Sequence, residues 1–218
     1  MRRIKSYVIR AGRMSSKQHS SLTEHLPRLG LPTSTPWNLE EIFSRKAPTV
    51  LEIGFGMGAS LIENAINRQH ENFIGIEVHP PGVGAILAKI DEAGINNIRV
   101  CMLDAITALE TLVPDASLSR VQLFFPDPWP KKRHNKRRIV QPEFINLIAK
   151  KLEKNGIFHI ATDWVPYADA IATLMKDHPA FLAEPDTTIH SDYRTQTKYE
   201  ARGHRLGHVV SDLVYINN

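Results

Sequence analysis

Short apolar runs and helically spaced apolar residues alternate along most of this 218-residue chain. A strand buried on both faces reads as a continuous apolar run, whereas an amphipathic helix repeats apolar residues every three or four positions. The alternation predicts an α/β fold of the Rossmann-like type, with a mostly parallel, seven-stranded sheet and helices on both faces. We expect strands at 49–54, 73–78, 98–103, 120–125 and 157–162, and weaker ones at about 181–188 and 208–216.

Helix start and stop residues occur between the predicted strands. Pro80 and Gly94 suit the first turn and the stop of one helix. Another amphipathic segment begins near Phe144, and the pair Asn155-Gly156 suits its end. Because ligands of such sheets bind at the carboxyl ends of the strands, we expect the functional residues directly after the strands.

The first predicted strand leads through Glu52 into a turn that contains Gly54, Gly56 and Gly58. Glycines at such a turn let the backbone approach a ligand where a Cβ would clash, and the following helix offers free N–H groups. The pattern predicts a nucleotide-like cofactor held by Gly54 and Gly56. A glycine-rich connection without a ligand is the structural alternative.

Four acidic residues lie at or just after successive predicted strands: Glu52, Glu77, Asp104 and Asp127. In a parallel sheet these positions converge on one crevice, so we expect the four carboxylates to line a common pocket. Each also has an ordinary structural interpretation, as a helix cap for Asp104 or Asp127 and as a surface acid for Glu77.

The glycine spacing alone fits two cofactors. Gly54-x-Gly56-x-x-Ala59 satisfies the dinucleotide fingerprint of an NAD-dependent dehydrogenase. Glu52, however, would repel a pyrophosphate and would instead accept hydrogen bonds from an ammonium group. With this acid included, the run resembles the first motif of the class I S-adenosylmethionine methyltransferases, whose cofactor carries a positive sulfonium.

The composition indicates the cellular compartment and the kind of binding partner. The single cysteine, Cys101, lies in an apolar strand, and we expect it to be a buried core residue in a reducing cytoplasm. No apolar run approaches the ~18 residues of a membrane span, and no secretory signal is visible.

The net charge of +4 is unevenly distributed, because residues 131–138 hold six Lys or Arg and no acid. This cluster predicts a polyanionic partner, with a solvated basic loop as the alternative.

A proline-rich segment, Phe124 to Pro130, precedes this basic cluster. Its three prolines predict a stiff loop, in which Trp129 either offers a flat surface to a base or packs in the core. A carboxylate, an aromatic ring and clustered positive charge together are typical of a nucleic-acid active site.

With these segments taken together, the chain resembles one specific family, the tRNA (guanine-N7-)-methyltransferases. The resemblance rests on the proline-basic block from Phe125 to Arg138, on Thr162-Asp163-Trp164 and on the block from Thr197 to His204. It extends over nearly the whole chain, including the basic stretch from Tyr7 to Arg13. Tyr199 stands where many members of the family carry Phe.

The resemblance implies methyl transfer from S-adenosylmethionine to N7 of a guanine at position 46 in the tRNA variable loop, without a metal. It further implies a role for each matching residue. Glu52, Glu77, Asp104 and Asp127 would bind the cofactor, and Asp127 would also be catalytic. Substrate contacts would come from Lys131, Asp163, Thr197, Lys198, Tyr199 and Glu200, and RNA contacts from Arg133, His134, Lys136, Arg137 and Arg138.

Guanine N7 carries a lone pair and no proton, so its methylation requires no strong base. We expect Asp127 to stabilise the positive charge that the ring gains, and Asp163 or Glu200 to accept from the guanine N1–H and amino group. Asp163 has an alternative interpretation as the cap of the following helix. A metal site at Glu200, His204 and His208 is disfavoured, because Gly203 and Gly207 interrupt the helix that this spacing requires.

We expect residues 1–36 to form an irregular basic extension, mobile unless docked on RNA, ahead of a methyltransferase domain at residues 37–218. Pro27 interrupts the weak helical spacing that this extension contains. No obligatory protein partner is evident from the sequence. The alternatives are a methyltransferase acting on another RNA, on DNA or on a protein, and a non-catalytic RNA-binding protein with the same fold.

Overall fold

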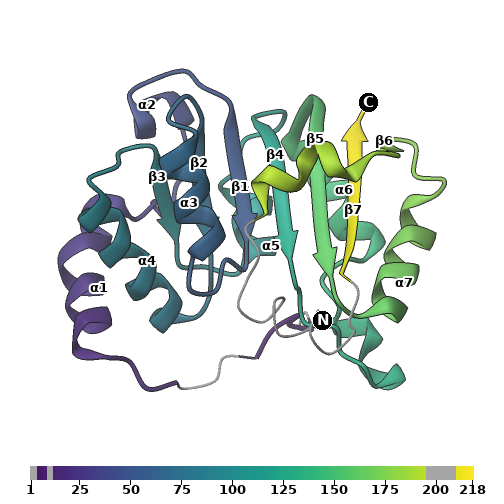
Figure 1. The fold of residues 1–218 in the computed structure, drawn as a ribbon, viewed down its shortest axis with the longest axis horizontal. Coiled ribbons are helices and arrows are strands. Elements are labelled where there is room, and N and C mark those ends of the chain that lie inside the picture. Colours follow the sequence, from purple (N-terminus) through teal and green to yellow (C-terminus); the bar gives the residue numbers. More distant parts are fainter. Residues whose placement is uncertain (1–3, 9–11, 195–209) are drawn as a thin grey trace.

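A central sheet with strand order β3-β2-β1-β4-β5-β7-β6 organises the computed structural model, which describes residues 4–8, 12–194 and 210–218 (Figure 1). The strands are β1 (Thr49–Ile53), β2 (Asn72–Ile76), β3 (Ile98–Cys101), β4 (Leu118–Phe124), β5 (Leu152–Thr162), β6 (Phe181–Ala183) and β7 (Ser211–Asn217). The strands from β1 to β5 pair in parallel, and β7 runs antiparallel to both of its neighbours. The predicted seven-stranded, mostly parallel sheet is confirmed.

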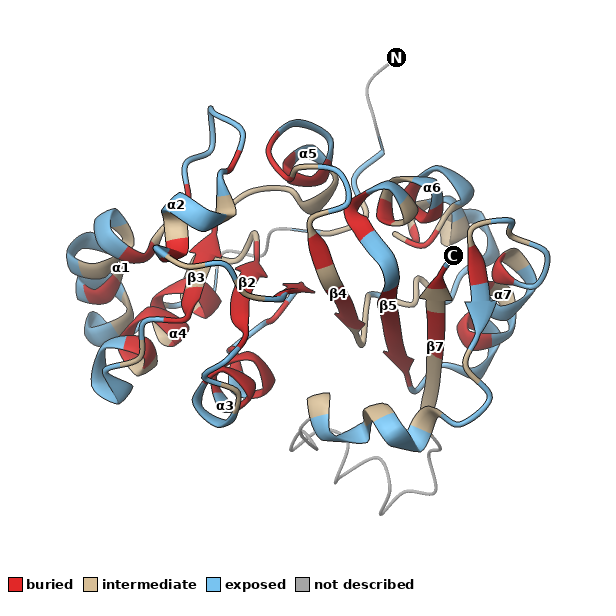
Figure 2. Cartoon of the chain, turned by 90° about the horizontal axis from the view of Figure 1, so that it is seen from above, coloured by how far each residue is buried: buried red, intermediate tan, exposed pale blue. Residues whose placement is uncertain are grey.

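Helices cover both faces of this sheet, as the prediction requires (Figure 2). The α-helices are α1 (Ser16–Leu29), α2 (Leu39–Phe43), α3 (Ala59–Asn67), α4 (Pro80–Ala93), α5 (Ala105–Thr111), α6 (Pro142–Lys151) and α7 (Val165–Met175). The described residues also form two 3-10 helices, η1 (Lys132–Arg137) and η2 (Thr187–Tyr193). Figure 2 shows α5, α6 and α7 on one side of the sheet and α3 and η2 on the other. Every residue of β1 and β2 is therefore buried.

The N-terminal extension is more ordered than its composition predicts. Residues 16–29 form α1, which begins at a capping box between Ser15 and Gln18 and packs along α4. Leu29 is fully buried, and Pro27 lies in the last turn of the helix, so the hydrogen bond that it cannot donate is lost only near the end of α1. The prediction of an irregular extension is therefore wrong for residues 16–29.

The turn at Asn155-Gly156 lies inside a strand rather than at the end of a helix. Helix α6 ends at Lys151 and β5 begins at the next residue. Asn155 has a φ of 63°, and the pairing of β4 with β5 shifts register between Leu118 and Arg120. The two residues thus form an irregularity within β5, which has the same local chemistry as a helix stop.

Gly84 of α4 tests the docking of α1. A Cβ at this position would meet the backbone oxygen of Gln18 at 2.4 Å. We expect Gly84→Ala to lower the free energy of unfolding by about 1–3 kcal/mol in urea denaturation, because α1 must move away. Gly→Ala inside a helix normally raises stability by about 1 kcal/mol, so an increase would show that α1 does not pack here.

Candidate active site

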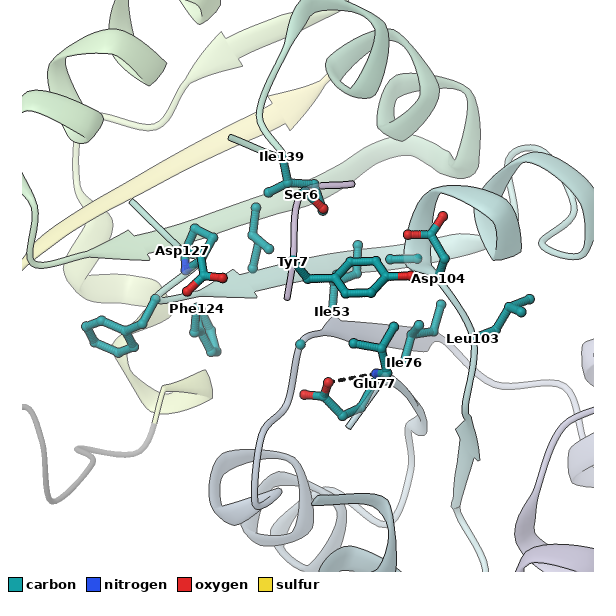
Figure 3. A pocket seen from close by; sticks show the side chains of 16 residues that line it. Ser6, Tyr7, Ile53, Ile76, Glu77, Leu103, Asp104, Phe124, Asp127 and Ile139 are labelled. Atoms are coloured by element: carbon teal, nitrogen blue, oxygen red, sulfur yellow. Dashed lines mark hydrogen bonds between the residues drawn. The ribbon is translucent and has the colours of Figure 1, made fainter. Parts of the chain in front are cut away.

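A cavity of about 220 Å³ opens at the carboxyl ends of β1 to β4 (Figure 3). The glycine turn, the acidic strand ends, the proline loop and the N-terminal segment all contribute to its wall. Its lining residues are Ser6, Tyr7, Ile53, Gly54, Ile76, Glu77, Val78, Leu103, Asp104, Ala105, Leu123, Phe124, Phe125, Pro126, Asp127 and Ile139. The predicted crevice therefore exists, and three of the four predicted acids line it.

The glycine turn leaves open space on its ligand side. Gly54, Gly56 and Gly58 have φ values of 72°, 57° and 69°, a region that L side chains rarely adopt. A Cβ on Gly54 or Gly56 would meet nothing within 4 Å, whereas one on Gly58 would lie 2.5 Å from Ile86. Gly58 is therefore required for packing, while Gly54 exposes its backbone to the cavity and Gly56 is exposed beside it.

Glu77 connects the glycine turn to the end of β2. Its Oε2 accepts a hydrogen bond from the Gly56 N–H at 2.9 Å. Its Oε1 accepts from the N–H groups of Val78 at 2.7 Å and His79 at 3.0 Å. The carboxylate retains acceptor capacity beyond these three bonds, because each oxygen has two lone pairs. Glu77 is buried, so its interpretation as a surface acid is wrong.

Asp104 combines a structural position with a place in the cavity wall. Its Oδ2 accepts hydrogen bonds from the N–H and the hydroxyl of Thr107, at 2.9 and 2.8 Å, which caps the start of α5. The helix-cap interpretation is confirmed, and the same residue lines the pocket. The two roles are compatible, because a carboxylate has a second oxygen.

The loop that carries Asp127 is held in an unusual backbone conformation. Phe125 and Trp129 have φ values of 51° and 42°, in the left-handed region that costs a residue with a large side chain about 1–3 kcal/mol. The prolines at 126, 128 and 130 fix φ between and beyond them. Asp127 itself is exposed at the mouth of the cavity, opposite Glu77 and Asp104 (Figure 3).

Glu52 is placed differently from the other three acids. It is the register partner of Gly75, and a Cβ on Gly75 would meet Leu61 and Phe55, so Glu52 leaves the sheet on the α3 face. Its Oε2 is buried without a hydrogen-bond partner. Burial raises the pKa of Glu52 to about 8. The side chain thus lies beneath the glycine turn rather than in the lining of the cavity.

The basic cluster forms η1, directly after the proline loop. Lys131, Arg133 and Lys136 are exposed there. Desolvation and the nearby positive charges of Arg133 and Arg137 lower the pKa of His134, which favours its neutral form at pH 7.

Arg138 points inward, unlike the exposed part of the cluster. It is buried, its Nε donates to the carbonyl of Pro128 at 2.8 Å, and its guanidinium lies 4.7 Å from the ring centroid of Tyr167. This placement argues against the predicted RNA contact by Arg138 and favours a structural role.

Trp129 is engaged on several sides. Its Nε1 donates to the carbonyl of Ser6 at 3.0 Å, and the guanidinium of Arg137 lies 4.8 Å from its ring centroid. The edge of the His134 ring contacts it as well, at a centroid distance of 5.8 Å. Trp129 therefore connects the N-terminal segment to the basic cluster, rather than presenting two free faces to a base.

Asp163 is exposed immediately after β5. The N-cap of α7 is Trp164, without a side-chain cap hydrogen bond, so the helix-cap interpretation of Asp163 is wrong. The predicted substrate residues Thr197, Lys198, Tyr199 and Glu200 lie outside the described residues. Among the residues that the structure describes, no group of three or more His, Cys, Asp or Glu side chains could hold a metal.

Ser6 and Tyr7 were not predicted to line the site. Figure 3 shows Tyr7 reaching across the cavity toward Asp104. The stretch from Tyr7 to Arg13 belongs to the family resemblance, but neither charge nor periodicity indicates that an aromatic side chain there would reach the cavity. The contact depends on the position of Trp129, which only the folded chain defines.

The chain is similar to several known proteins. A family model described as "Putative methyltransferase" matches residues 46–213. A protein of Shewanella amazonensis, named tRNA (guanine-N(7)-)-methyltransferase, is 52% identical over 99% of this chain and 92% of its own length. One of the same name from Shewanella sp. (strain W3-18-1) is 51% identical over the same shares. The chain belongs to the tRNA (guanine-N(7)-)-methyltransferase family.

Solved structures support the fold of this family member. The chain aligns along 100% of both lengths with the 16S rRNA methyltransferase KamB, at 15% identity and a TM-score of 0.58. It also covers 95% of the aminoglycoside resistance methyltransferase NpmB1, with 84% of its own length, 16% identity and a TM-score of 0.57. In the described part of the chain, no helix is long and apolar enough to cross a membrane.

Glu52 predicts a pH dependence of stability. Because its pKa is raised to about 8 from an ordinary value of 4.5, the folded protein keeps a proton that the unfolded chain releases, so stability falls as pH rises from 4.5 to 8. We expect Glu52→Gln to stabilise the ligand-free protein at pH 8 relative to pH 5, by up to about 4 kcal/mol. Denaturant unfolding at both pH values measures this.

The exposed Glu153 supplies the matched control, since Glu153→Gln changes the same functional group without a buried charge. An equal effect of Glu52→Gln at both pH values would contradict the burial of an unpaired carboxylate.

Proposed function

We propose that this chain transfers the methyl group of S-adenosylmethionine to N7 of a guanine in tRNA, at position 46 of the variable loop, forming 7-methylguanosine. The observation that carries the proposal is the full-length similarity to relatives of that name, at 52% identity. It is supported by an acidic cavity that adjoins an exposed basic cluster.

The cavity fits this cofactor chemically. Ile53, Ile76 and Leu103 offer an apolar surface to an adenine, and the open side of the glycine turn admits a ligand against the backbone. Glu52 does not line the cavity; we assign its buried, unpaired Oε2 to an ammonium group that reaches it beneath the glycine turn. When bound, S-adenosylmethionine supplies a methyl group activated by the positive sulfonium.

Glu77 and Asp104 are suited to hydroxyl groups of the cofactor ribose. Glu77 is fixed by three backbone N–H groups, so its orientation is set before the ligand arrives. Asp104 is held by Thr107 through one oxygen, which leaves the other available to a ligand. The binding site is therefore preorganised on rigid elements.

Asp127 is the residue that we assign to catalysis. Guanine N7 has no proton to remove, so the enzyme must orient the base and stabilise the positive charge that it acquires. A carboxylate at the cavity mouth, on a loop stiffened by three prolines, meets that need. Lys131 and Asp163 are exposed near the same strand ends and are assigned to the substrate.

The basic cluster is assigned to the tRNA backbone. Arg133 and Lys136 are free to reach phosphates, whereas Arg137 contacts Trp129 and Arg138 is buried. We retain the predictions of a cytoplasmic location and of activity without an obligatory protein partner.

The function is tested by incubating the protein with radiolabelled S-adenosylmethionine and bulk tRNA from a strain that lacks this activity. Nucleoside analysis should find the label in 7-methylguanosine. Label in another nucleoside, or no incorporation into tRNA, would contradict the proposal and favour a methyltransferase with a different substrate.

Asp127→Asn should lower kcat on tRNA by about 10²–10³, because the stabilising negative charge is lost while the shape of the side chain is kept. The melting temperature should stay within about 2 °C of wild type, since Asp127 is exposed. The exposed Asp169 on α7 provides the control variant Asp169→Asn. Comparable losses of stability and activity would show that Asp127 is only a turn residue.

Replacing Arg133 and Lys136 together by Ala should weaken tRNA binding and reduce the slope of log Kd against log salt by about 1.5–2, since two phosphate contacts are lost. Affinity for S-adenosylmethionine should be unaffected. Lys154 and Lys176, which are exposed at the opposite end of the sheet, form the matched control pair. An unaltered salt slope would refute the assignment of the cluster.

A further inference from the structure

Arg194 contacts the loop that carries Asp127. Its guanidinium lies 5.8 Å from the ring centroid of Phe125, within the range of a cation–π interaction. Phe125 lines the cavity two residues before Asp127 and has a φ of 51°. Such a conformation persists in a non-glycine residue only where the surroundings hold it. The Phe125 N–H donates to the carbonyl of Ala161 at 2.8 Å, and its ring is covered by Arg194.

Asp212 of β7 fixes the position of this guanidinium. Nε and Nη2 of Arg194 donate to the two carboxylate oxygens, each at 2.9 Å, in a geometrically specific two-pronged contact. Nε2 of the buried His159 donates to Oδ1 of the same carboxylate at 2.9 Å. Burial acts to raise the pKa of Asp212, but the hydrogen bonds from His159 and Arg194 outweigh it and hold the pKa below its ordinary value. Asp212 is therefore charged at neutral pH.

Tyr193, the residue before Arg194, is held by contacts with residues of other elements. Its hydroxyl donates to Oε1 of Glu71 at 2.6 Å, and its carbonyl accepts from Nδ2 of Asn64 in α3 at 2.7 Å. The guanidinium of Arg120 lies 3.8 Å from its ring centroid. In Figure 1, η2 crosses the sheet in front of β4 and β5. Arg194 follows directly after η2, so the contacts of Tyr193 also fix the backbone that leads into Arg194.

We propose that Arg194 is a positioning residue for methyl transfer: anchored by Asp212, it holds Phe125 and thereby sets the place of Asp127 at the cavity mouth. This inference rests on the proposed function. The Arg194 side chain is 14% exposed and its charge is matched by Asp212. Both facts disfavour a direct contact with tRNA phosphate, which is the main alternative for an arginine in this region.

The first test compares Arg194→Gln with wild type in the tRNA methylation assay. We expect kcat to fall about 10–100-fold, because displacement of a reacting group by about 1 Å has an effect of that size. The Kd values for tRNA and for S-adenosylhomocysteine should change less than threefold. Asp212→Asn should show the same profile, because it keeps the Arg194 residue but removes the charged group that fixes its guanidinium.

A conservative variant and a control variant distinguish a positioning role of Arg194 from a role that depends only on its positive charge. Arg194→Lys keeps the charge but loses the two-pronged geometry, so it should remain at least fivefold below wild type in kcat. Should Arg194→Gln fail to fold, Arg194→Lys carries the same comparison. The control is Arg28→Gln, which breaks another Arg–Asp contact, to Asp91 at 2.7 Å, on the surface between α1 and α4. It should leave kcat unchanged.

A double-mutant cycle tests whether Arg194 affects methyl transfer through Phe125. If Arg194 acts through Phe125, then Phe125→Leu combined with Arg194→Gln should be no more than threefold slower than the slower single variant. Multiplicative losses would overturn the inference, as would a rise in tRNA Kd with unaltered kcat or full rescue by Arg194→Lys. A wild-type protein that methylates no tRNA would overturn the proposed function as well, whereas an active wild type with an equally active Arg194→Gln would overturn the positioning role alone.

Discussion

The carboxylate of Glu77 joins the two turns on which the cavity depends. It accepts hydrogen bonds from the glycine turn after β1 and from the chain that leaves β2, and it is itself buried. Without it, three backbone N–H groups at the carboxyl edge of the sheet would lose their partner. The Gly54 N–H donates directly to the carbonyl of Ile76 in β2 at 2.8 Å, so Glu77 fixes chiefly Gly56 relative to the end of β2. The parallel sheet brings these ends together, and Glu77 keeps them in one arrangement.

Charge is divided between two adjoining regions. The cavity wall carries Glu77, Asp104 and Asp127, and the exposed cluster beyond it carries lysine and arginine side chains. This division suits a cationic cofactor on one side and a polyanionic substrate on the other, with Asp127 between them. A loop of three prolines and two left-handed residues separates the regions, so their spacing is set by stiff backbone rather than by flexible side chains.

Most of the fold was predictable from the sequence, because buried parallel strands and amphipathic helices leave strong local patterns. The exceptions are places where tertiary contacts decide. Helix α1 forms despite Pro27 because it packs on α4, and the Asn155-Gly156 turn lies within β5 because the neighbouring strand shifts register.

The site was predictable wherever it depended on strand ends. The sequence could not show that Glu52 leaves the sheet on the α3 face, that Arg138 turns inward toward Tyr167, or that Arg194 covers Phe125. Each of these depends on side-chain direction in the folded chain, which composition and spacing do not specify.

The cavity and the basic cluster together are assigned to the transfer of a methyl group to N7 of one guanine in tRNA. The most direct measurement is to treat the methylated tRNA with borohydride and aniline, which cleave RNA at 7-methylguanosine, and to map the cut by sequencing. We predict one enzyme-dependent cut, in the variable loop at position 46. Methylated tRNA that resists cleavage, or that is cut elsewhere, would contradict it.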